Sequence, residues 1–134
     1  MNIKKKINIA FVGCGRVANH YKNLMNSNNL NETKVIGVCD VDLAKAKKFS
    51  HNFSENFFDN IDEMLNYKNI DLAIICTPSG MHYSHASILI NKGINVLVEK
   101  PLTLTIHQTE KLEIMAKKKK VLLNVAFQNR LNPA

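Results

Sequence analysis

The sequence predicts an α/β protein whose core is a doubly wound parallel sheet in a single domain. Short apolar runs alternate with segments of helical apolar spacing along the whole chain, which is typical of β-α repeats. The chain has 134 residues, of which 46% are hydrophobic and 22% charged. This size suits one globular domain, since domains commonly contain roughly 100 to 150 residues. Because crossovers between parallel strands are right-handed, we expect six strands in the order 3-2-1-4-5-6.

The first part of the chain predicts a strand, a tight turn and a helix. Residues 7–12 form an apolar run that stops at Gly13, which indicates a strand buried on both faces. Apolar residues then recur at helical spacing until the Asn-rich segment 26–31 breaks the pattern. The members of this helical stripe are Val17, Tyr21, Leu24 and Met25.

Two further strand and helix pairs follow. Residues 34–39 predict a strand that ends at Asp40, and a helical stripe comes directly after it. A short strand is expected around Phe57 and Phe58, before a brief helix over residues 61–66. The members of the stripe after Asp40 are Leu43, Ala46, Phe49 and Phe53.

The second half of the chain keeps the same alternation. We expect strands over residues 70–76, 95–98 and 121–126. A helix over residues 83–91 should be closed by Gly93, because glycine readily adopts the left-handed conformation that ends helices. Thr105 and Gln108 predict a capping box at the start of the last helix. The apolar residues of that helix are Leu112, Met115 and Ala116.

Composition restricts where the protein works and what it binds. No apolar run approaches the ~20 residues that a membrane helix needs, and residues 1–6 lack the apolar stretch of a secretory signal, so we expect a cytoplasmic protein. The net charge of +7 suggests an acidic partner, but its lysines cluster at residues 4–6 and 117–120. Since no aromatic stacking platform or DNA-binding motif accompanies them, nucleic acid is not an expected partner.

The three cysteines are expected to be free thiols. Cys14, Cys39 and Cys76 are odd in number and form no CxxC pair, which favours a reducing compartment over a disulfide framework. Metal sites prefer closely spaced ligand pairs, and Cys39 and Cys76 lie within apolar runs, so no metal is expected.

The first turn carries a dinucleotide-binding pattern. Residues 13–18 read Gly-Cys-Gly-Arg-Val-Ala, the GxGxxA form, between a predicted strand and a predicted helix. Gly13 permits the tight turn, Gly15 lets a pyrophosphate approach the backbone, and Ala18 allows close packing of helix on strand. Small residues for packing alone are the alternative explanation. We expect Gly13, Gly15, Arg16 and Val17 to bind the cofactor at the helix N-terminus.

Asp40 strengthens the dinucleotide hypothesis and indicates the type of cofactor. At the end of the second strand its carboxylate can accept hydrogen bonds from the adenosine ribose, and it would repel the extra phosphate of NADP. NAD is therefore favoured, although Lys45, Lys47 and Lys48 follow closely. S-adenosylmethionine remains the main rival ligand, because methyltransferases also use a glycine-rich turn and an acidic residue there.

Two later segments complete a family resemblance. Residues 77–82 read Thr-Pro-Ser-Gly-Met-His and follow the fourth strand, and Glu99-Lys100-Pro101 follows the fifth. Together with the GxGxxA turn and Asp40, they resemble the glucose-fructose oxidoreductase, inositol dehydrogenase and MocA family over nearly the whole chain. The resemblance implies a Rossmann-fold NAD-binding domain. It also implies an enzyme that transfers a hydride between nicotinamide and a hydroxyl carbon of a sugar or nucleotide-sugar.

The resemblance assigns roles to residues after the fourth and fifth strands. Lys100 would lie near the nicotinamide and the reacting hydroxyl, where a cation can stabilise negative charge on the substrate oxygen. The alternative is a solvated lysine paired with Glu99. His82 and His85, taken alone, are more often helix-start and surface residues. The cofactor contacts implied by the resemblance are Thr77, Pro78, Ser79, His82, Glu99, Lys100, Pro101 and Gln128.

The end of the chain resembles a crossing between domains. Residues 1–126 would form the NAD-binding domain, and residues 127–134 would begin the crossing to a β-rich substrate domain that the chain does not contain. Residues 128–133 resemble family members that oxidise nucleotide-linked amino sugars, and Arg130 becomes a candidate substrate contact. We expect this chain alone to be inactive and expect homo-oligomers only of a complete protein. The alternative is a stand-alone dinucleotide-binding or regulatory module.

Overall fold

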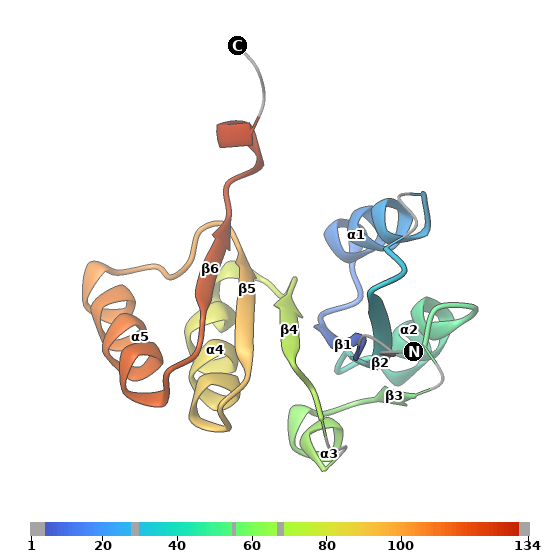
Figure 1. Ribbon diagram of the computed structural model, residues 1–134, viewed down its shortest axis with the longest axis horizontal. Helices are drawn as coiled ribbons and strands as arrows, with labels where there is room; N and C mark the ends of the chain where they lie inside the picture. The colour runs from blue at the N-terminus through green and yellow to red at the C-terminus, as the bar shows by residue number, and fades with distance from the viewer. Residues whose placement is uncertain (1–4, 28–29, 55, 67–68, 132–134) are drawn as a thin grey trace.

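The computed structural model describes residues 5–27, 30–54, 56–66 and 69–131 and contains the predicted parallel sheet. Six strands lie in the order β3-β2-β1-β4-β5-β6, and each neighbouring pair is parallel (Figure 1). The expected fold class and strand order are therefore confirmed. The strands are β1 (Ile7–Val12), β2 (Thr33–Cys39), β3 (Phe57–Phe58), β4 (Leu72–Ile75), β5 (Asn95–Glu99) and β6 (Leu123–Ala126).

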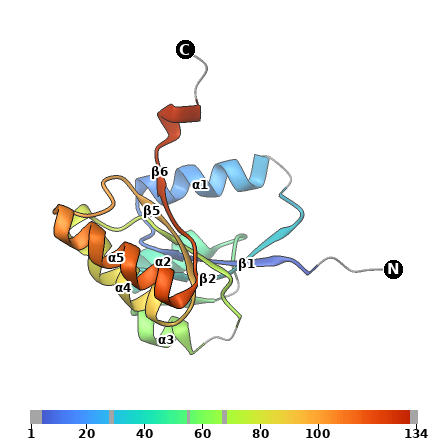
Figure 2. The same cartoon turned by 60° about the vertical axis from the view of Figure 1, so that its left-hand side comes forward.

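Helices cover both faces of the sheet, with α4 and α5 side by side on the face opposite α1 (Figure 2). Alternate residues of β1 point into different cores, as the period of a strand requires. Phe11 packs with Ala18 of α1 and Phe49 of α2, whereas Val12 packs with the core beneath α3, α4 and α5. The helices are α1 (Arg16–Ser27), α2 (Leu43–Ser50), α3 (Ile61–Leu65), α4 (His82–Asn91) and α5 (Ile106–Lys119), with 3₁₀ turns η1 (Ser79–Met81) and η2 (Gln128–Leu131).

Side-chain caps explain where three of the helices begin. The side chain of Asp42 accepts a hydrogen bond from the N–H of Lys45 at α2, and Asn60 does the same for Glu63 at α3. Thr105 accepts from the N–H of Gln108 at α5, so this half of the predicted capping box is present. Each cap satisfies a backbone donor that the helix itself cannot satisfy.

The expectation that the whole run 7–12 is buried on both faces was wrong at its first residue. Ile7, expected to be buried on both faces, is 46% exposed because β1 extends beyond the core at its start. Val17, which was expected at the cofactor, and Leu24 of the same stripe are each 41% exposed and line a cavity beside α1. Leu43 is also exposed, and Phe53 lies beyond the end of α2, although it packs on the same core. A 3.6-residue period locates a helix but does not show which apolar residues face the sheet.

Beyond β6 the chain leaves the sheet and reaches η2 (Figures 1 and 2). Asn132 and Pro133, part of the expected crossing segment, lie outside the described residues. Among the described helices, none has the length and apolar character to span a membrane.

Two left-handed residues at helix ends allow a matched stability test. Gly93 has φ 77° after α4, with open space where a Cβ would lie, and Lys120 has φ 56° after α5. Gly93→Ala should lower the free energy of unfolding by about 1 kcal/mol through backbone strain alone, and Lys120→Gly should raise it by up to about 1 kcal/mol. Thermal denaturation should show shifts of roughly 4 °C in opposite directions. Shifts of the same sign would contradict this explanation of the two helix ends.

Candidate cofactor site

The turn after β1 is pressed against the end of β4. Gly13 has φ 90°, and a Cβ at this position would lie 2.8 Å from the backbone carbon of Cys76 and the nitrogen of Thr77. The N–H of Gly13 donates to the carbonyl of Cys39, and the N–H of Cys76 donates to the carbonyl of Val12. Only glycine tolerates both the left-handed φ and the close approach. The predicted tight turn is confirmed.

The rest of the turn, from Gly15 to Val17, leads into α1 and is accessible to solvent. A Cβ at Gly15 would have no heavy atom within 4 Å, and Arg16 and Val17 are exposed. Ala18 is fully buried against the sheet, as its small size suggested. The first N–H groups of a helix lack intrahelical acceptors and carry partial positive charge. The backbone at Gly15 and at the start of α1 can therefore receive an anionic group.

Asp40 joins the turn to the start of α2. Its Oδ2 accepts a hydrogen bond from the N–H of Cys14 at 2.9 Å, and its Oδ1 accepts from the N–H of Asp42 at 3.0 Å. The side chain is half-buried at the end of β2. A carboxylate has about four acceptor positions, so these two bonds leave capacity for hydroxyl donors of a ligand.

A cavity of about 620 Å³, here named the Asp40 cavity, extends from this carboxylate across the carboxyl ends of the strands. Its lining includes three acidic residues, Asp40, Asp59 and Asp62, together with Lys45 and His85. Apolar side chains complete its lining, and one of them, Val41, is 83% exposed. Those apolar residues include Val41, Ile61, Pro78, Met81 and Ile88.

A second cavity of about 540 Å³, the Lys100 cavity, lies between α1 and the loop after β5. Cys76, Thr77 and Pro78 line both cavities, so the loop after β4 forms their common wall. Most of the expected site residues meet in these two cavities. The lining of the Lys100 cavity includes Arg16, Val17, Thr77, Pro78, Ser79, His82, Glu99, Lys100 and Gln128.

Glu99 is held by Tyr21 and does not form an ion pair with Lys100 in the described structure. The hydroxyl of Tyr21 donates to Oε1 of Glu99 at 2.7 Å, whereas Lys100 contacts this carboxylate only through its backbone N–H. Burial, followed by the nearby carboxylate, raises the pKa of Tyr21 above its usual range. The Lys100 side chain is exposed and lines the cavity. The peptide bond between Lys100 and Pro101 is cis.

His82 is the first residue of α4, as the sequence suggested, but neither histidine of this helix is a surface residue. His82 is only 1% exposed, and its ring nitrogens contact the carbonyl oxygens of Thr77 and Pro101. His85 is half-buried, and its Nδ1 lies 3.1 Å from the hydroxyl of Thr77. Burial, and then the neighbouring His82, lowers the pKa of His85.

The three cysteines are free and lie at the ends of adjacent strands beneath the cavities. Burial raises the pKa of each thiol to about 12, with nearby carboxylates adding to the effect. A thiol with so high a pKa is neutral and unreactive near pH 7. Among the described residues no cluster of histidine, cysteine or carboxylate side chains has the arrangement of a metal site.

Two expected residues lie outside the linings of both cavities. Pro101 contributes its carbonyl to His82, and the guanidinium of Arg130 lies 4.9 Å from the ring centre of Phe127. The sequence interpretation missed the apolar wall formed by Val41, Met81 and Ile88. Exposure of Val41 directly after Asp40 is the feature that marks this wall, and exposure is not visible in a sequence pattern.

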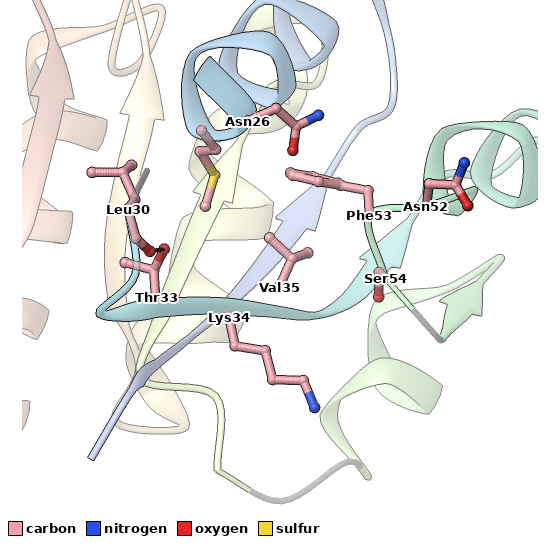
Figure 3. A pocket seen from close by; sticks show the side chains of 9 residues that line it. Asn26, Leu30, Thr33, Lys34, Val35, Asn52, Phe53 and Ser54 are labelled. Carbon is pink, nitrogen blue, oxygen red and sulfur yellow. Dashed lines mark hydrogen bonds between the residues drawn. The ribbon is translucent and has the colours of Figure 1, made fainter. Parts of the chain in front are cut away.

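A third cavity, of about 460 Å³, lies at the amino end of β2 (Figure 3). Val35 of β2 lies toward Phe53, which follows α2, and Thr33 lies beside Leu30, while Lys34 extends from the opposite side of the strand. In parallel α/β sheets, ligands bind beyond the carboxyl ends of the strands, which is where the other two cavities are.

Known proteins resemble this chain in sequence and in structure. It is 43% identical over 70 residues to scyllo-inositol 2-dehydrogenase (NADP(+)) IolW of Bacillus subtilis, covering 52% of this chain and 19% of that protein. It is 27% identical over 127 residues to D-glucoside 3-dehydrogenase of Escherichia coli, covering 92% of this chain and 35% of that protein.

A solved structure gives the same result. The WlbA dehydrogenase of Chromobacterium violaceum, in complex with NADH and UDP-GlcNAcA, superposes with a TM-score of 0.91 at 31% identity, covering 97% of this chain and 37% of that one. The chain thus spans only 19% to 37% of the length of these relatives. Residues 7–127 match the model of an oxidoreductase family with an NAD-binding Rossmann fold, the GFO_IDH_MocA family. The chain therefore belongs to the GFO_IDH_MocA oxidoreductases and forms their NAD(P)-binding Rossmann domain.

Proposed function

We propose that this domain binds NAD, in preference to NADP, and serves hydride transfer to or from a hydroxyl carbon of a sugar or nucleotide-sugar. The observation that carries the proposal is the Asp40 carboxylate, which is hydrogen-bonded to the glycine turn and lines a large cavity. An acidic residue at this position accepts hydrogen bonds from the adenosine ribose hydroxyls.

The pyrophosphate would lie against Gly15 and the first turn of α1. This position leaves space for close approach, and the helix N-terminus supplies unpaired N–H donors and a favourable dipole. Gly13, Arg16 and Val17 would complete the contact. The N–H of Cys14 is already used by Asp40, so the anion would depend on the amides that follow it.

The Asp40 cavity would hold the adenosine half. Its apolar side chains, Val41 and Met81 among them, suit the faces of an adenine ring. Asp40, Asp59 and Asp62 outnumber Lys45, so the cavity would repel the additional phosphate of NADP. Within the family, IolW is named for NADP(+) and the WlbA structure contains NADH, so the cofactor varies among relatives.

The Lys100 cavity would hold the nicotinamide and the reacting part of the substrate. When bound, the nicotinamide ring supplies the hydride acceptor or donor. Thr77, Pro78 and Ser79 would form the wall against the ring, and Lys100 is exposed at the cavity, where its ammonium can hydrogen-bond the substrate oxygen. A cation at this place stabilises the negative charge that develops on that oxygen.

The proposed substrate class, a sugar or nucleotide-sugar, is based on what related proteins bind or oxidise. WlbA was solved with a nucleotide-linked sugar acid, and another relative is a D-glucoside 3-dehydrogenase. We propose that residues 127–134 begin the connection to a substrate domain, which would also supply subunit contacts, and that Arg130 and Gln128 lie near the ligand. The free thiols fit a reducing compartment such as the cytoplasm.

Replacement of Asp40 tests the cofactor preference. Asp40→Asn should weaken NADH binding roughly tenfold and reduce discrimination against NADPH, because the ribose loses an ionised acceptor and the phosphate loses a repulsive charge. Calorimetric titrations with NADH, NADPH and S-adenosylmethionine would measure this. Asp42→Asn removes the same charge two residues away and keeps the helix cap, so its cofactor preference should match the unmodified chain. Equal preferences in both variants would remove Asp40 from the site.

The two glycines of the turn should respond differently to alanine. Gly13→Ala should destabilise the fold by at least about 2 kcal/mol, because it combines a left-handed φ with a clash against Cys76 and Thr77. Gly15→Ala should leave stability nearly unchanged and weaken NADH binding, since its methyl group would occupy the space expected for the pyrophosphate. Denaturant unfolding and NADH titration measure the two effects. Full NADH affinity in Gly15→Ala would contradict the proposed position.

The role of Lys100 can be tested in a protein that joins this domain to a substrate domain of the family. Lys100→Ala should reduce kcat by 10²-fold or more, on the order expected for loss of a charged group that contacts the reacting oxygen. NADH affinity should stay within roughly threefold, because only the side chain beyond the cofactor is lost. Steady-state kinetics measure the effect on kcat, and titration measures the effect on NADH affinity. Turnover equal to that of Lys92→Ala, a lysine at the end of α4, would eliminate the catalytic role.

A further inference from the structure

His82 connects the two loops that carry the proposed nicotinamide site. Its Nε2 lies 2.7 Å from the carbonyl oxygen of Thr77, after β4, and its Nδ1 lies 2.6 Å from the carbonyl oxygen of Pro101, after β5. The side chain is 1% exposed at the first residue of α4. No other described hydrogen bond joins the Thr77 loop to the segment around Pro101.

Both groups that the His82 ring contacts, the carbonyl oxygens of Thr77 and Pro101, can only accept hydrogen bonds. The ring must therefore carry a proton on each nitrogen that bonds to one of them. A backbone carbonyl has lone pairs and no hydrogen, and the proline at position 101 also lacks an N–H. A neutral imidazole has one N–H, so it can donate to only one of the two carbonyls and would direct a lone pair at the other. Only the doubly protonated ring donates to both.

We propose that His82 is a buried imidazolium that holds the loop after β4 to the loop after β5 and thereby positions Lys100. Both contacts are shorter than the 2.9 to 3.0 Å usual for neutral N–H···O bonds, as charge-assisted bonds are. The charged ring thus receives two strong bonds, which offset the cost of its burial. Its effect on catalysis rests on the function proposed above; the protonation of the ring does not.

The titratable groups near His82 include His85, Glu99 and Lys100. The pKa of His85, one turn along α4, is lowered by burial and then by His82. The carboxylate of Glu99 accepts bonds from Tyr21 and from the N–H of Lys100, and neither acceptor of the His82 ring is a carboxylate. His82 and Lys100 line the same cavity, together with Arg16 and His20. Glu99 lines this cavity as well, but no carboxylate is bonded to the His82 ring, so the charge of the ring is not neutralised by an ion pair.

Two consequences follow for the Lys100 cavity. The bond to Pro101 fixes the backbone next to Lys100, whose side chain is exposed and has no described side-chain hydrogen bond or ion pair. His82 is accordingly a positioning residue for Lys100. In addition, a cation beside the nicotinamide position disfavours the positively charged oxidised ring relative to the neutral reduced ring. The domain should therefore bind NADH more tightly than NAD⁺.

Nitrogen NMR of the unmodified chain tests the protonation of His82 without any cofactor. With ¹⁵N-labelled histidine at neutral pH, the His82 ring should show two protonated nitrogens with similar shifts and two N–H protons that exchange slowly with water. One protonated and one bare nitrogen would overturn the proposal. Because this measurement needs no ligand, it can succeed even if the chain fails to bind NADH, which would refute the proposed function alone.

Variants test the functional consequence. His82→Gln retains a polar side chain but loses the charge and one of the two bonds, so the ratio of NADH to NAD⁺ affinity should fall by on the order of tenfold. His107→Gln, an exposed histidine of α5, is the matched control and should leave the ratio unchanged. A ratio in folded His82→Gln equal to that of the control would overturn the electrostatic role. If His82→Gln does not fold, the nitrogen spectrum of the unmodified chain still decides the proposal.

Discussion

The close approach of Gly13 to the backbone of Cys76 and Thr77 is the constraint on which the site depends. It brings the ends of β1 and β4 into direct contact, and the bond from Gly13 to Cys39 adds the end of β2. Because three strand ends meet here, the amides that open α1, the Asp40 carboxylate and the loop after β4 all face the same space. A bulkier side chain at Gly13 would separate these elements before any ligand contact were lost.

Hydrogen bonds then fix the geometry of the Asp40 cavity and of the Lys100 cavity. Asp40 uses its carboxylate to hold the turn to α2, and its remaining acceptor capacity faces the cavity, so one group both shapes the site and can contact a ligand. On the other side of the Thr77 loop, the proposed His82 imidazolium joins this loop to the loop after β5 by donating to their carbonyl oxygens. The site thus has mainly carboxylates where a ribose would lie, and Lys100 and Arg16 together with Glu99 where a substrate oxygen would lie.

Much of this arrangement could be predicted from the sequence, because the main signals are local. Apolar runs and their period predicted the alternation of strands and helices, from which the doubly wound strand order followed. Gly13, Asp40 and Gly93 each occupy positions with a specific backbone or strand-end requirement. Burial was harder to predict. Leu24 has the spacing of a core residue but lines a cavity, and His82 starts a helix as expected but is buried because it contacts the loop that contains Pro101. Contacts between segments far apart in the chain decide these cases, and no local pattern encodes them.

The central claim is that NADH lies across the Asp40 and Lys100 cavities, with its pyrophosphate at the start of α1. Titration of the ¹⁵N-labelled chain with NADH, followed by amide chemical shifts, tests this directly. The largest changes are expected at Gly15 and Arg16, at Val41 and at Ser79, all at the carboxyl ends of the strands. Changes confined to Thr33 and Ser54, which line the cavity in Figure 3, or no changes at saturating NADH, would contradict it.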